Sequence, residues 1–217
     1  MTEQEFSNEF DILYNNIMSN QAPGLDEYEK SVFLTQAQEE FIIGVYSGRL
    51  LQSFEETEEI RRYLDSIVKT QVLTSGNYSL PVSDNSKFFT APEDLWFIVS
   101  EYAKLEDNNK HVDVVPITHD AFLKVRNNPF KKDNKRRALR LGQANSEGLI
   151  EIISNNEIKD YTIKYISKPD PIIIGDLYGT NLSIDDKTDK MACKLNPVTH
   201  RYILKLAVEL AAKAYKN

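Results

Sequence analysis

The first seventy residues carry apolar side chains at steps of three and four, the spacing that lines one face of a helix. Phe6, Phe10, Leu13 and Ile17 follow this spacing and predict a first helix. The motif "QAPG", residues 21–24, ends it, because proline lacks a backbone donor and glycine tolerates positive φ.

A second helix is predicted between Asp26 and Gly48. Asp26 is a good N-cap residue, and Glu29 three residues later gives a variant of the capping box. Gly48 stands where a left-handed C-terminal residue is expected. The apolar positions of this helix form a broad stripe: Val32, Phe33, Leu34, Ala37, Phe41, Ile42 and Val45.

The stretch "SFEETEEIRRYLDSIVKT", residues 53–70, repeats these signals and predicts a third helix. Ser53 and Glu56 form a capping box, and acidic residues fill the first turn, where the helix dipole favours negative charge. Three helices joined by short connections predict a helical bundle over residues 1–75.

The middle of the chain changes to the period of strands. Residues 94–105 and 111–117 are β-rich runs separated by a polar turn, which predicts a hairpin. A short helix capped by Thr118 is expected next. It should end at Asn128-Pro129, because the residue before a proline is pushed out of the helical region.

Three further runs show partial alternation of apolar and polar positions: residues 136–143, 149–154 and 161–167. Short runs of this kind, separated by polar turns, predict an antiparallel meander. The prolines of "KPDPI" end it, because proline cannot continue a central strand. Residues 76–175 are therefore expected to form an antiparallel β subdomain with a short helix.

Residues 176–217 are predicted to form a loop and a C-terminal helix that packs on the bundle. Asn196 is a good N-cap residue, and Pro197 suits the first helical position. Small residues beside the apolar stripe would let a neighbouring helix approach closely. The stripe is Val198, Ile203, Leu206, Leu210 and Ala214, flanked by Ala207 and Ala211. The fold class is thus α+β, with an N-terminal helical bundle, a C-terminal helix and an inserted antiparallel β-sheet subdomain.

Composition narrows the class of protein. The net charge of −7 and a pI near 5.1 argue against non-specific binding to a phosphate backbone as the main task. A single cysteine rules out an internal disulfide and fits a reducing compartment. No apolar run approaches the roughly 20 residues that span a bilayer, so no membrane partner is expected.

Motifs that carry chemistry are absent from the sequence. It holds no glycine-rich phosphate loop, no CxxC, no HExxH and no GxSxG. His111, His119 and His200 fall in three predicted elements; the first two flank one strand and could approach each other. We interpret all three as surface or capping histidines. Cys193 is interpreted as a buried small residue rather than a nucleophile.

Acidic clusters are interpreted as solvated surface. The cluster at residues 55–59 opens a predicted helix, where the dipole stabilises each carboxylate by about 0.3–1 kcal/mol. The loops with Asp107 and Asp113, and with Asp185, Asp186 and Asp189, lack the pattern of a calcium site. The sequence therefore predicts no catalytic residue, no metal and no cofactor.

A basic run stands out in this acidic chain: Lys131, Lys132, Lys135, Arg136, Arg137 and Arg140. Such a run can contact nucleic-acid phosphates, which would make the chain a DNA-binding accessory protein. It can equally form a charged contact patch that meets an acidic face of another subunit. No aromatic residue is interleaved to form a stacking platform for single strands. We favour the second interpretation, because the chain is acidic overall.

Several motifs, in order and over nearly the whole chain, resemble one group of proteins. They are "EFSNEFDILYNNIMSNQAPGLDEYEKSVFLTQAQEEFI", "TAPEDLWFIVSEYA", "VVPITHDAFLKVRNNPF", "YTIKYISKPDPII" and "CKLNPVTHRYILKLAVELAAKAY". The chain is similar to the virion ring and head-to-tail adaptor (connector) proteins of crAss-like podoviruses that infect Bacteroidales.

The resemblance implies a non-enzymatic structural protein that forms a ring in the phage tail below the portal. Rings of this group stack around the channel through which genome and cargo leave, and their copies follow the twelve-fold symmetry of the portal. Expected partners are neighbouring copies, the portal protein, other tail ring proteins and, in passage, DNA and cargo proteins. The expected location is the virion, with the host cytoplasm during assembly.

Contacts between copies should involve the broad helical stripes, which one copy need not cover alone. The compact length and the C-terminal helix favour a ring near the portal, where that helix would dock on the bundle or on the portal. An acidic lumen would suit a DNA conduit, because it repels phosphate. The candidate interface residues are Phe33, Phe41, Tyr46, Leu206 and Leu210, with the charged patch at residues 131–140.

Overall fold

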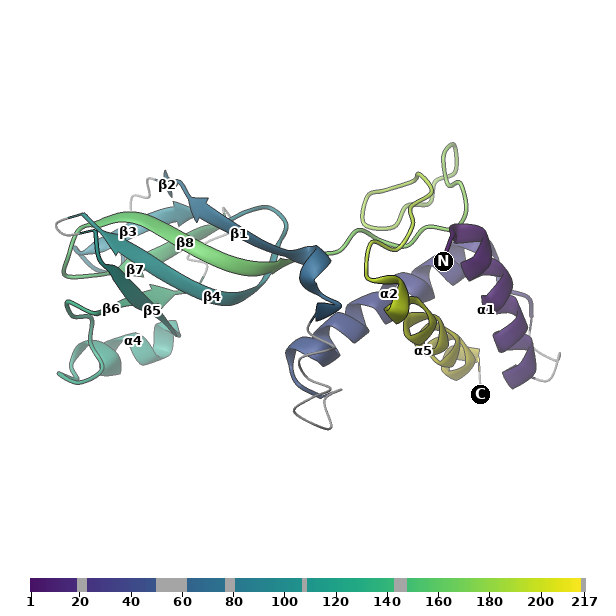
Figure 1. Ribbon diagram of the computed structural model, residues 1–217, viewed down its shortest axis with the longest axis horizontal. Coiled ribbons are helices and arrows are strands. Elements are labelled where there is room, and N and C mark those ends of the chain that lie inside the picture. The colour runs from purple at the N-terminus through teal and green to yellow at the C-terminus, as the bar shows by residue number, and fades with distance from the viewer. Residues whose placement is uncertain (19–22, 50–61, 77–80, 107–108, 143–147, 216–217) are drawn as a thin grey trace. The chain divides into compact units, whose positions relative to one another are not determined.

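The computed structural model (Figure 1) describes residues 1–18, 23–49, 62–76, 81–106, 109–142 and 148–215. The chain forms two compact units. One is helical and comprises Met1–Ile67 with Pro169–Asn217, and the other is a sheet unit comprising Val68–Lys168. The predicted α+β class is confirmed, with helices at both ends of the sequence and the strands between them.

The helical unit is built from α1 (Glu3–Met18), α2 (Glu27–Tyr46) and α5 (Pro197–Tyr215). The last helix packs against both of the others, so the two ends of the chain share one core. Its centre holds large apolar side chains with no exposed surface: Phe6, Phe10, Leu34, Ile42 and Ile203.

Local signals at the ends of α2 act as predicted. The Asp26 carboxylate accepts a hydrogen bond from the Glu29 backbone at 2.7 Å, and the Glu29 carboxylate accepts one from the Asp26 backbone at 3.0 Å. Gly48 has a φ of 74°, the left-handed conformation that glycine adopts without strain, directly after the C-cap Ser47.

The buried face of α5 differs from the predicted stripe. Val198 is 66% exposed, and Leu206 and Leu210 are only half-buried. The helix packs on two partners, so its contact face is centred on the alanine flank that allows close approach. That face consists of Thr199, His200, Ile203, Leu204, Ala207, Val208, Ala211 and Ala212.

The predicted third helix lies largely outside the described residues, and so do Ser53 and Glu56. Its expected end at Thr70 is wrong. Asp65–Ile67 form a short 3-10 turn, and the chain is already extended from Val68. Pairing with a long strand from later in the sequence overrides the helical period there.

The described part of the sheet unit has eight strands: β1 (Val68–Leu73), β2 (Ser75–Gly76), β3 (Ser86–Thr90), β4 (Leu95–Leu105), β5 (His111–Ile117), β6 (Arg137–Leu141), β7 (Leu149–Ile153) and β8 (Ile158–Ser167). Their order across the sheet is β1-β8-β4-β5-β6-β7-β3-β2. The two strands at the ends of this order are joined by Thr74 alone, so the sheet must curl until its edges meet. The Thr90 amide donates to the Thr74 carbonyl at 3.0 Å and reinforces this closure.

Strand pairing confirms the hairpin β4–β5 but contradicts the three-strand meander. Strands β6 and β7 are antiparallel neighbours, whereas β8 pairs with β1 and β4. The free side of β7 is taken by β3, a strand that the sequence pattern does not predict. Strands β5 and β6 run parallel, and the helix α4 (His119–Arg126) makes the crossover that parallel strands need. Thr118 is its N-cap residue, without a side-chain capping bond.

Closure gives the sheet an interior and an exterior, and each has its own apolar cluster. The interior cluster is formed by alternate residues of most strands, among them Phe89, Val112, Ile152, Tyr161 and Ile163. A smaller exterior cluster joins Phe122 of α4 to Leu139, Leu141 and Ile153. The helix α4 therefore covers part of the outer face at β6 and β7.

Candidate functional site

Two of the three histidines lie exposed on the sheet unit. His111 stacks on Tyr102 with ring centroids 4.8 Å apart, and His119 opens α4. They stand at opposite ends of the extended β5, which separates them by on the order of 20 Å. The suggestion that they approach each other is therefore wrong.

The third histidine is a core residue, which corrects its assignment to the surface or a cap. His200 is buried, and its Nε2 donates to the Leu195 carbonyl at 3.0 Å. Its Nδ1 accepts from the Met1 amine at 2.8 Å, and the Phe6 ring lies 5.5 Å away. Burial lowers the pKa of His200, which keeps the ring neutral.

Cys193 is buried, as predicted, and its thiol donates to Gln38 Oε1 at 3.2 Å. Burial raises the pKa of this thiol to about 11, so it is a poor nucleophile. The Gln38 amide donates in turn to the Asp170 carbonyl at 2.8 Å. Through Gln38, these bonds attach two segments to α2: the one around Asp170, just after the sheet unit, and the one around Cys193, before α5.

Acidic side chains form no metal centre in the described residues, where no group of three His, Cys, Asp or Glu could hold an ion. Asp107 and the cluster at residues 55–59 fall outside these residues. The sequence pattern did not predict one buried carboxylate, Glu151. Glu151 of β7 accepts from the Val82 amide at 2.8 Å and from the Ser86 hydroxyl, so it holds the turn before β3 in place.

The five apolar interface candidates lie in different environments. Phe41 is buried and meets the Tyr202 ring at 5.4 Å, and Phe33 is partly covered by Tyr215 at 6.5 Å. Tyr46 is 46% exposed at the end of α2. Leu206 and Leu210 lie half-buried along α5.

The basic run does not lie on one surface. Arg140 points into the curled sheet, where its Nε donates to both oxygens of Glu101 at 3.0 and 2.8 Å, and the Tyr161 hydroxyl donates to the same carboxylate. Arg137 is partly buried and donates to the Phe130 carbonyl at 3.2 Å. The remaining four cations are exposed: Lys131, Lys132, Lys135 and Arg136.

An exposed aromatic residue, which the helix and strand patterns do not reveal, lies beside this run. Phe130 is 88% exposed and directly precedes Lys131. No aromatic is interleaved within residues 131–140, but Phe130 places an exposed ring at the edge of the run. The signal was in the sequence, because "NNPF" places an aromatic in a proline turn rather than on a helix or strand face.

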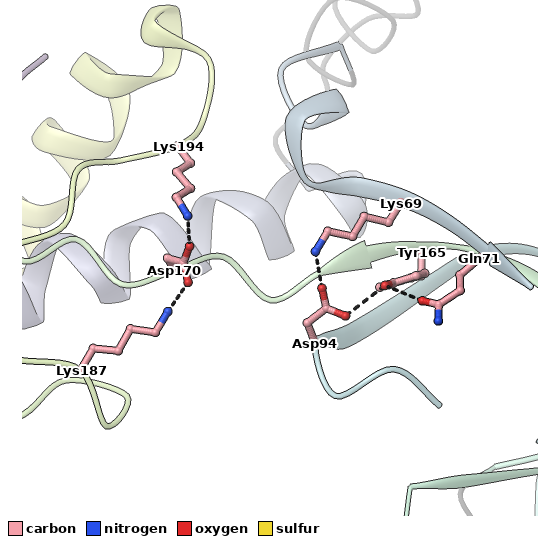
Figure 2. A network of polar contacts seen from close by, with 7 residues as sticks. All are labelled: Lys69, Gln71, Asp94, Tyr165, Asp170, Lys187 and Lys194. Carbon is pink, nitrogen blue, oxygen red and sulfur yellow. Dashed lines mark hydrogen bonds and ion pairs between the residues drawn. The ribbon is translucent and has the colours of Figure 1, made fainter. Parts of the chain in front are cut away.

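Figure 2 shows two polar networks, one within the sheet unit and one within the helical unit. In the sheet unit, Asp94 pairs with Lys69 and accepts from the Tyr165 hydroxyl at 3.0 Å. Burial raises the pKa of Asp94, but these two hydrogen bonds outweigh it and the pKa lies below its ordinary value. Burial also raises the pKa of Tyr165, to about 12.

The network of the helical unit is centred on Asp170, which pairs with Lys187 and Lys194. These hydrogen bonds hold the pKa of Asp170 below its ordinary value. The pairs join the segment after β8 to two later parts of the loop before α5. Both networks tie chain segments together and bring no reactive pair into a cavity.

The two units differ in charge. The sheet unit holds 15 lysines and arginines against 13 aspartates and glutamates, a formal charge of +2. The helical unit holds the remaining 11 lysines and arginines and the remaining 20 aspartates and glutamates, a formal charge of −9. The charges of the two units add to the −7 of the whole chain. No described helix is long and apolar enough to cross a bilayer.

Comparison with known proteins supplies the family. The whole chain, residues 1–217, matches the family described as phage tail ring protein 3/4. It is 44% identical to ring protein 3 of Bacteroides phage crAss001 over 97% of this chain and 95% of that protein. It is 35% identical to ring protein 4/5 of the same phage over 100% and 94% of the two chains. The chain belongs to the phage tail ring protein 3/4 family.

This ring protein therefore has a structural role in the tail of a crAss-like phage virion, as the motifs indicated. In a structural protein the residues of interest are those that it leaves uncovered. The most exposed large apolar side chains are Phe130, Tyr178, Val198, Leu123 and Ile12. Only Val198 belongs to a predicted stripe, and the other four lie outside every one.

Proposed function

We propose that this chain assembles with identical copies into a closed ring of twelve, stacked with other rings and the portal around the channel for genome and cargo. The family match over the full chain is the observation that carries the proposal. Two ring proteins of one phage are similar to this chain along nearly their whole length. One fold therefore serves more than one ring in that phage, which supports stacking of related rings.

The contact between neighbouring copies must join two different surfaces, because a ring grows by repeating a head-to-tail contact. The helical unit offers one apolar surface of this kind at the end of α2, where Tyr46 is exposed. Leu206 and Leu210 on α5 keep part of their surface uncovered. Phe33 would add its free edge, whereas Phe41 would support the surface from the core.

Charge supports a role as a conduit. A charge of −9 on the helical unit would repel phosphate if this unit lined the lumen, and DNA would pass without sticking. The sheet unit, at +2, would then face away from the channel. The greater identity to ring protein 3 favours the corresponding position in the stack. A portal contact through α5 would suit a ring at the portal end.

Purified protein tests the proposal through its mass and its shape. Twelve copies of 24.9 kDa should give a particle of about 300 kDa. Negative-stain images should show rings, either for the protein alone or on addition of purified portal. A particle of 24.9 kDa at every concentration, with and without portal, would contradict ring formation.

A second candidate function is DNA binding by the basic run, favoured by the exposed Phe130 beside Lys131 and Lys132. A base could stack on this ring while the lysines hold phosphates. The inward position of Arg140 weakens this candidate, because only part of the run reaches the surface. Affinity for DNA that falls steeply with salt would support it.

A further inference from the structure

One surface of the sheet unit combines an exposed aromatic with exposed cations. It lies on α4 and the turn that follows, and we call it the basic tip. Phe130 is 88% exposed and Leu123 is 65% exposed. The basic tip consists of Leu123, Phe130, Lys131, Lys132, Lys135 and Arg136.

The basic tip is held in a defined conformation by its own backbone. The Asn128 side chain accepts from the Phe130 amide at 3.0 Å, and the Asn128 carbonyl accepts from the amides of Lys131 and Lys132. Arg137 donates to the Phe130 carbonyl. Within the described residues, no carboxylate lies within ion-pair distance of the four exposed cations. Among the described residues, a partner that meets this ring and these charges therefore has no ion pair to break.

A surface with the opposite charge lies on the helical unit, in the loop before α5, and we call it the acidic loop. Tyr178 is 81% exposed, and Leu182, four residues later, is also exposed. Four aspartates lie in this loop: Asp176, Asp185, Asp186 and Asp189. Of its lysines, Lys187 and Lys194 pair with Asp170, which leaves the exposed Lys190 against these carboxylates. The acidic loop consists of Asp176, Tyr178, Leu182, Asp186 and Asp189.

The acidic loop is also anchored rather than loose. Leu177 and Ile184 are buried against Ile173, and the Leu177 amide donates to the Thr188 carbonyl at 3.0 Å. The Asp176 carboxylate accepts from the Tyr178 amide at 3.0 Å, which sets the direction of the chain at the exposed ring. The loop thus presents an aromatic side chain on a fixed backbone, as the basic tip does.

We propose that the basic tip of one copy docks on the acidic loop of the next copy in the ring. The inference rests on the proposed function, since it names the surfaces that the ring contact joins. Each surface pairs an aromatic ring exposed by more than four-fifths with several charges of a single dominant sign. Burial of the two rings would provide apolar area, and the opposite charges would set partner and register.

A second copy fits these observations better than a nucleic acid does. DNA would satisfy the basic tip but would leave the anchored Tyr178 uncovered and would be repelled by the acidic loop. Another copy covers both surfaces at once, because every copy carries one of each. Two different surfaces on one chain are what a head-to-tail ring contact requires.

Charge-altered variants of the full chain test the proposal. The tip variant carries Lys131→Glu, Lys132→Glu and Arg136→Glu. The loop variant carries Asp176→Asn, Asp186→Asn and Asp189→Lys. Asparagine can still accept from the Tyr178 amide and tolerates the positive φ of Asp186. Rings are counted by mass photometry and negative stain, with portal added if the unaltered protein needs it.

Each variant alone should form at least ten-fold fewer rings than the unaltered protein, because like charges then meet at every contact. An equal mixture of the two variants should form rings again, since alternating copies restore a match at each contact. Restoration on mixing also shows that both variants are folded. A matched control, Lys159→Glu with Lys164→Glu, reverses two exposed lysines of β8 and should assemble normally.

The outcomes separate the two proposals. Rings of the unaltered protein decide the proposed function, and their absence would remove this inference with it. Normal rings from either variant alone, or no restoration on mixing, would overturn the docking proposal and leave the ring intact. If the tip variant forms normal rings but loses salt-sensitive binding to duplex DNA, the basic tip is a nucleic-acid surface. Phe130→Ser and Tyr178→Ser, which leave the charges unchanged, should also reduce assembly if docking is correct.

Discussion

The core of the helical unit and the core of the sheet unit are stabilised by different kinds of contact. The core of the helical unit is apolar at its centre, and its polar residues act at helix ends and in fastening the returning chain to α2. Its buried Lys30 pairs with Asp11, a carboxylate that is half exposed. The curled sheet instead encloses an ion pair, Glu101 with Arg140, among aromatic and aliphatic side chains. Both partners of the pair in the sheet are largely covered, whereas Asp11 keeps contact with solvent. The sheet core therefore depends more strongly on a charge keeping its partner, and the helical core more on packed volume.

This difference can be measured because the two units have separate optical signals. The chain has one tryptophan, Trp96, which lies in β4 and stacks on Phe97 at 4.8 Å. Its fluorescence reports the sheet unit. Circular dichroism at helical wavelengths reports mainly α1, α2 and α5. A variant that acts on one unit should therefore shift one signal more than the other.

The largest expected effect is in the helical core. Phe10→Ala removes a ring with no exposed surface and should lower the free energy of unfolding by about 3–5 kcal/mol. The loss should be seen in urea titrations followed by circular dichroism, with a smaller shift in Trp96 fluorescence. Ile12→Ala, on the same helix but 60% exposed, is the matched control and should change stability by less than about 0.5 kcal/mol. Equal effects of the two changes would contradict the packing described for α1.

Loss of the enclosed charge partner should come next. Arg140→Met leaves Glu101 inside the sheet without its cation, and breaking a buried pair costs about 3–5 kcal/mol. Because Arg140 keeps some contact with solvent, we expect about 2–3 kcal/mol, seen chiefly in Trp96 fluorescence. The double variant with Glu101→Gln should recover part of the loss. A double variant less stable than Arg140→Met would show that the pair is not the cause.

A close backbone approach in the helical unit gives a smaller effect. A Cβ at Gly175 would lie 2.8 Å from Glu27 Cβ, so Gly175→Ala must displace the first turn of α2. Overpacking of this kind costs about 1–3 kcal/mol, and the loss should follow the circular dichroism signal. Gly24→Ala is the control, since a Cβ there meets nothing within 4 Å. If Gly175→Ala is as stable as the unaltered protein, the segment around Gly175 can move away from α2 without loss of stability, which would contradict a close contact there.

The smallest effect is a pH dependence confined to the helical unit. The pKa of His200 is lowered by burial, so protonation favours the unfolded chain. Stability from this group is complete above its unfolded pKa of about 6.5 and is lost as pH falls towards the folded value. One proton limits the slope to about 1.4 kcal/mol per pH unit. Thermal unfolding between pH 7 and pH 5 should show the loss by circular dichroism, and His200→Gln should remove it. An equal pH dependence in His200→Gln would assign the effect to another group.

The same contrast explains what could be predicted from the sequence. The ends of α2 were predicted correctly because Asp26, Glu29 and Gly48 act within one helical turn of their own position. The hairpin β4–β5 and the helix α4 were also predicted, since their signals are local. The expectation for α5 failed in part because two helices share its buried face, and no periodicity reveals the direction of two partners.

The errors in the sheet unit have a different origin. Closure joins strands that are far apart in sequence, so β8 pairs with β1 rather than with β7. No local pattern encodes such pairing, and the turn before β3 depends on the buried Glu151 from a distant strand. Arg140 points inward because alternate residues of β6 face the interior of the sheet, with Ala138 on the same side. Counting charges along the basic run does not take this alternation into account. Phe130 was overlooked because it lies in a turn, where helix and strand periods do not apply.

The central claim is that identical copies form a closed ring in the tail through contacts between unlike surfaces. Cryo-electron microscopy of intact virions at side-chain resolution tests it most directly. We expect repeated copies around the tail axis, with Phe130 of each copy covered by the Tyr178 region of its neighbour. A single copy per tail, or copies that contact one another through the same surface on both sides, would contradict the account.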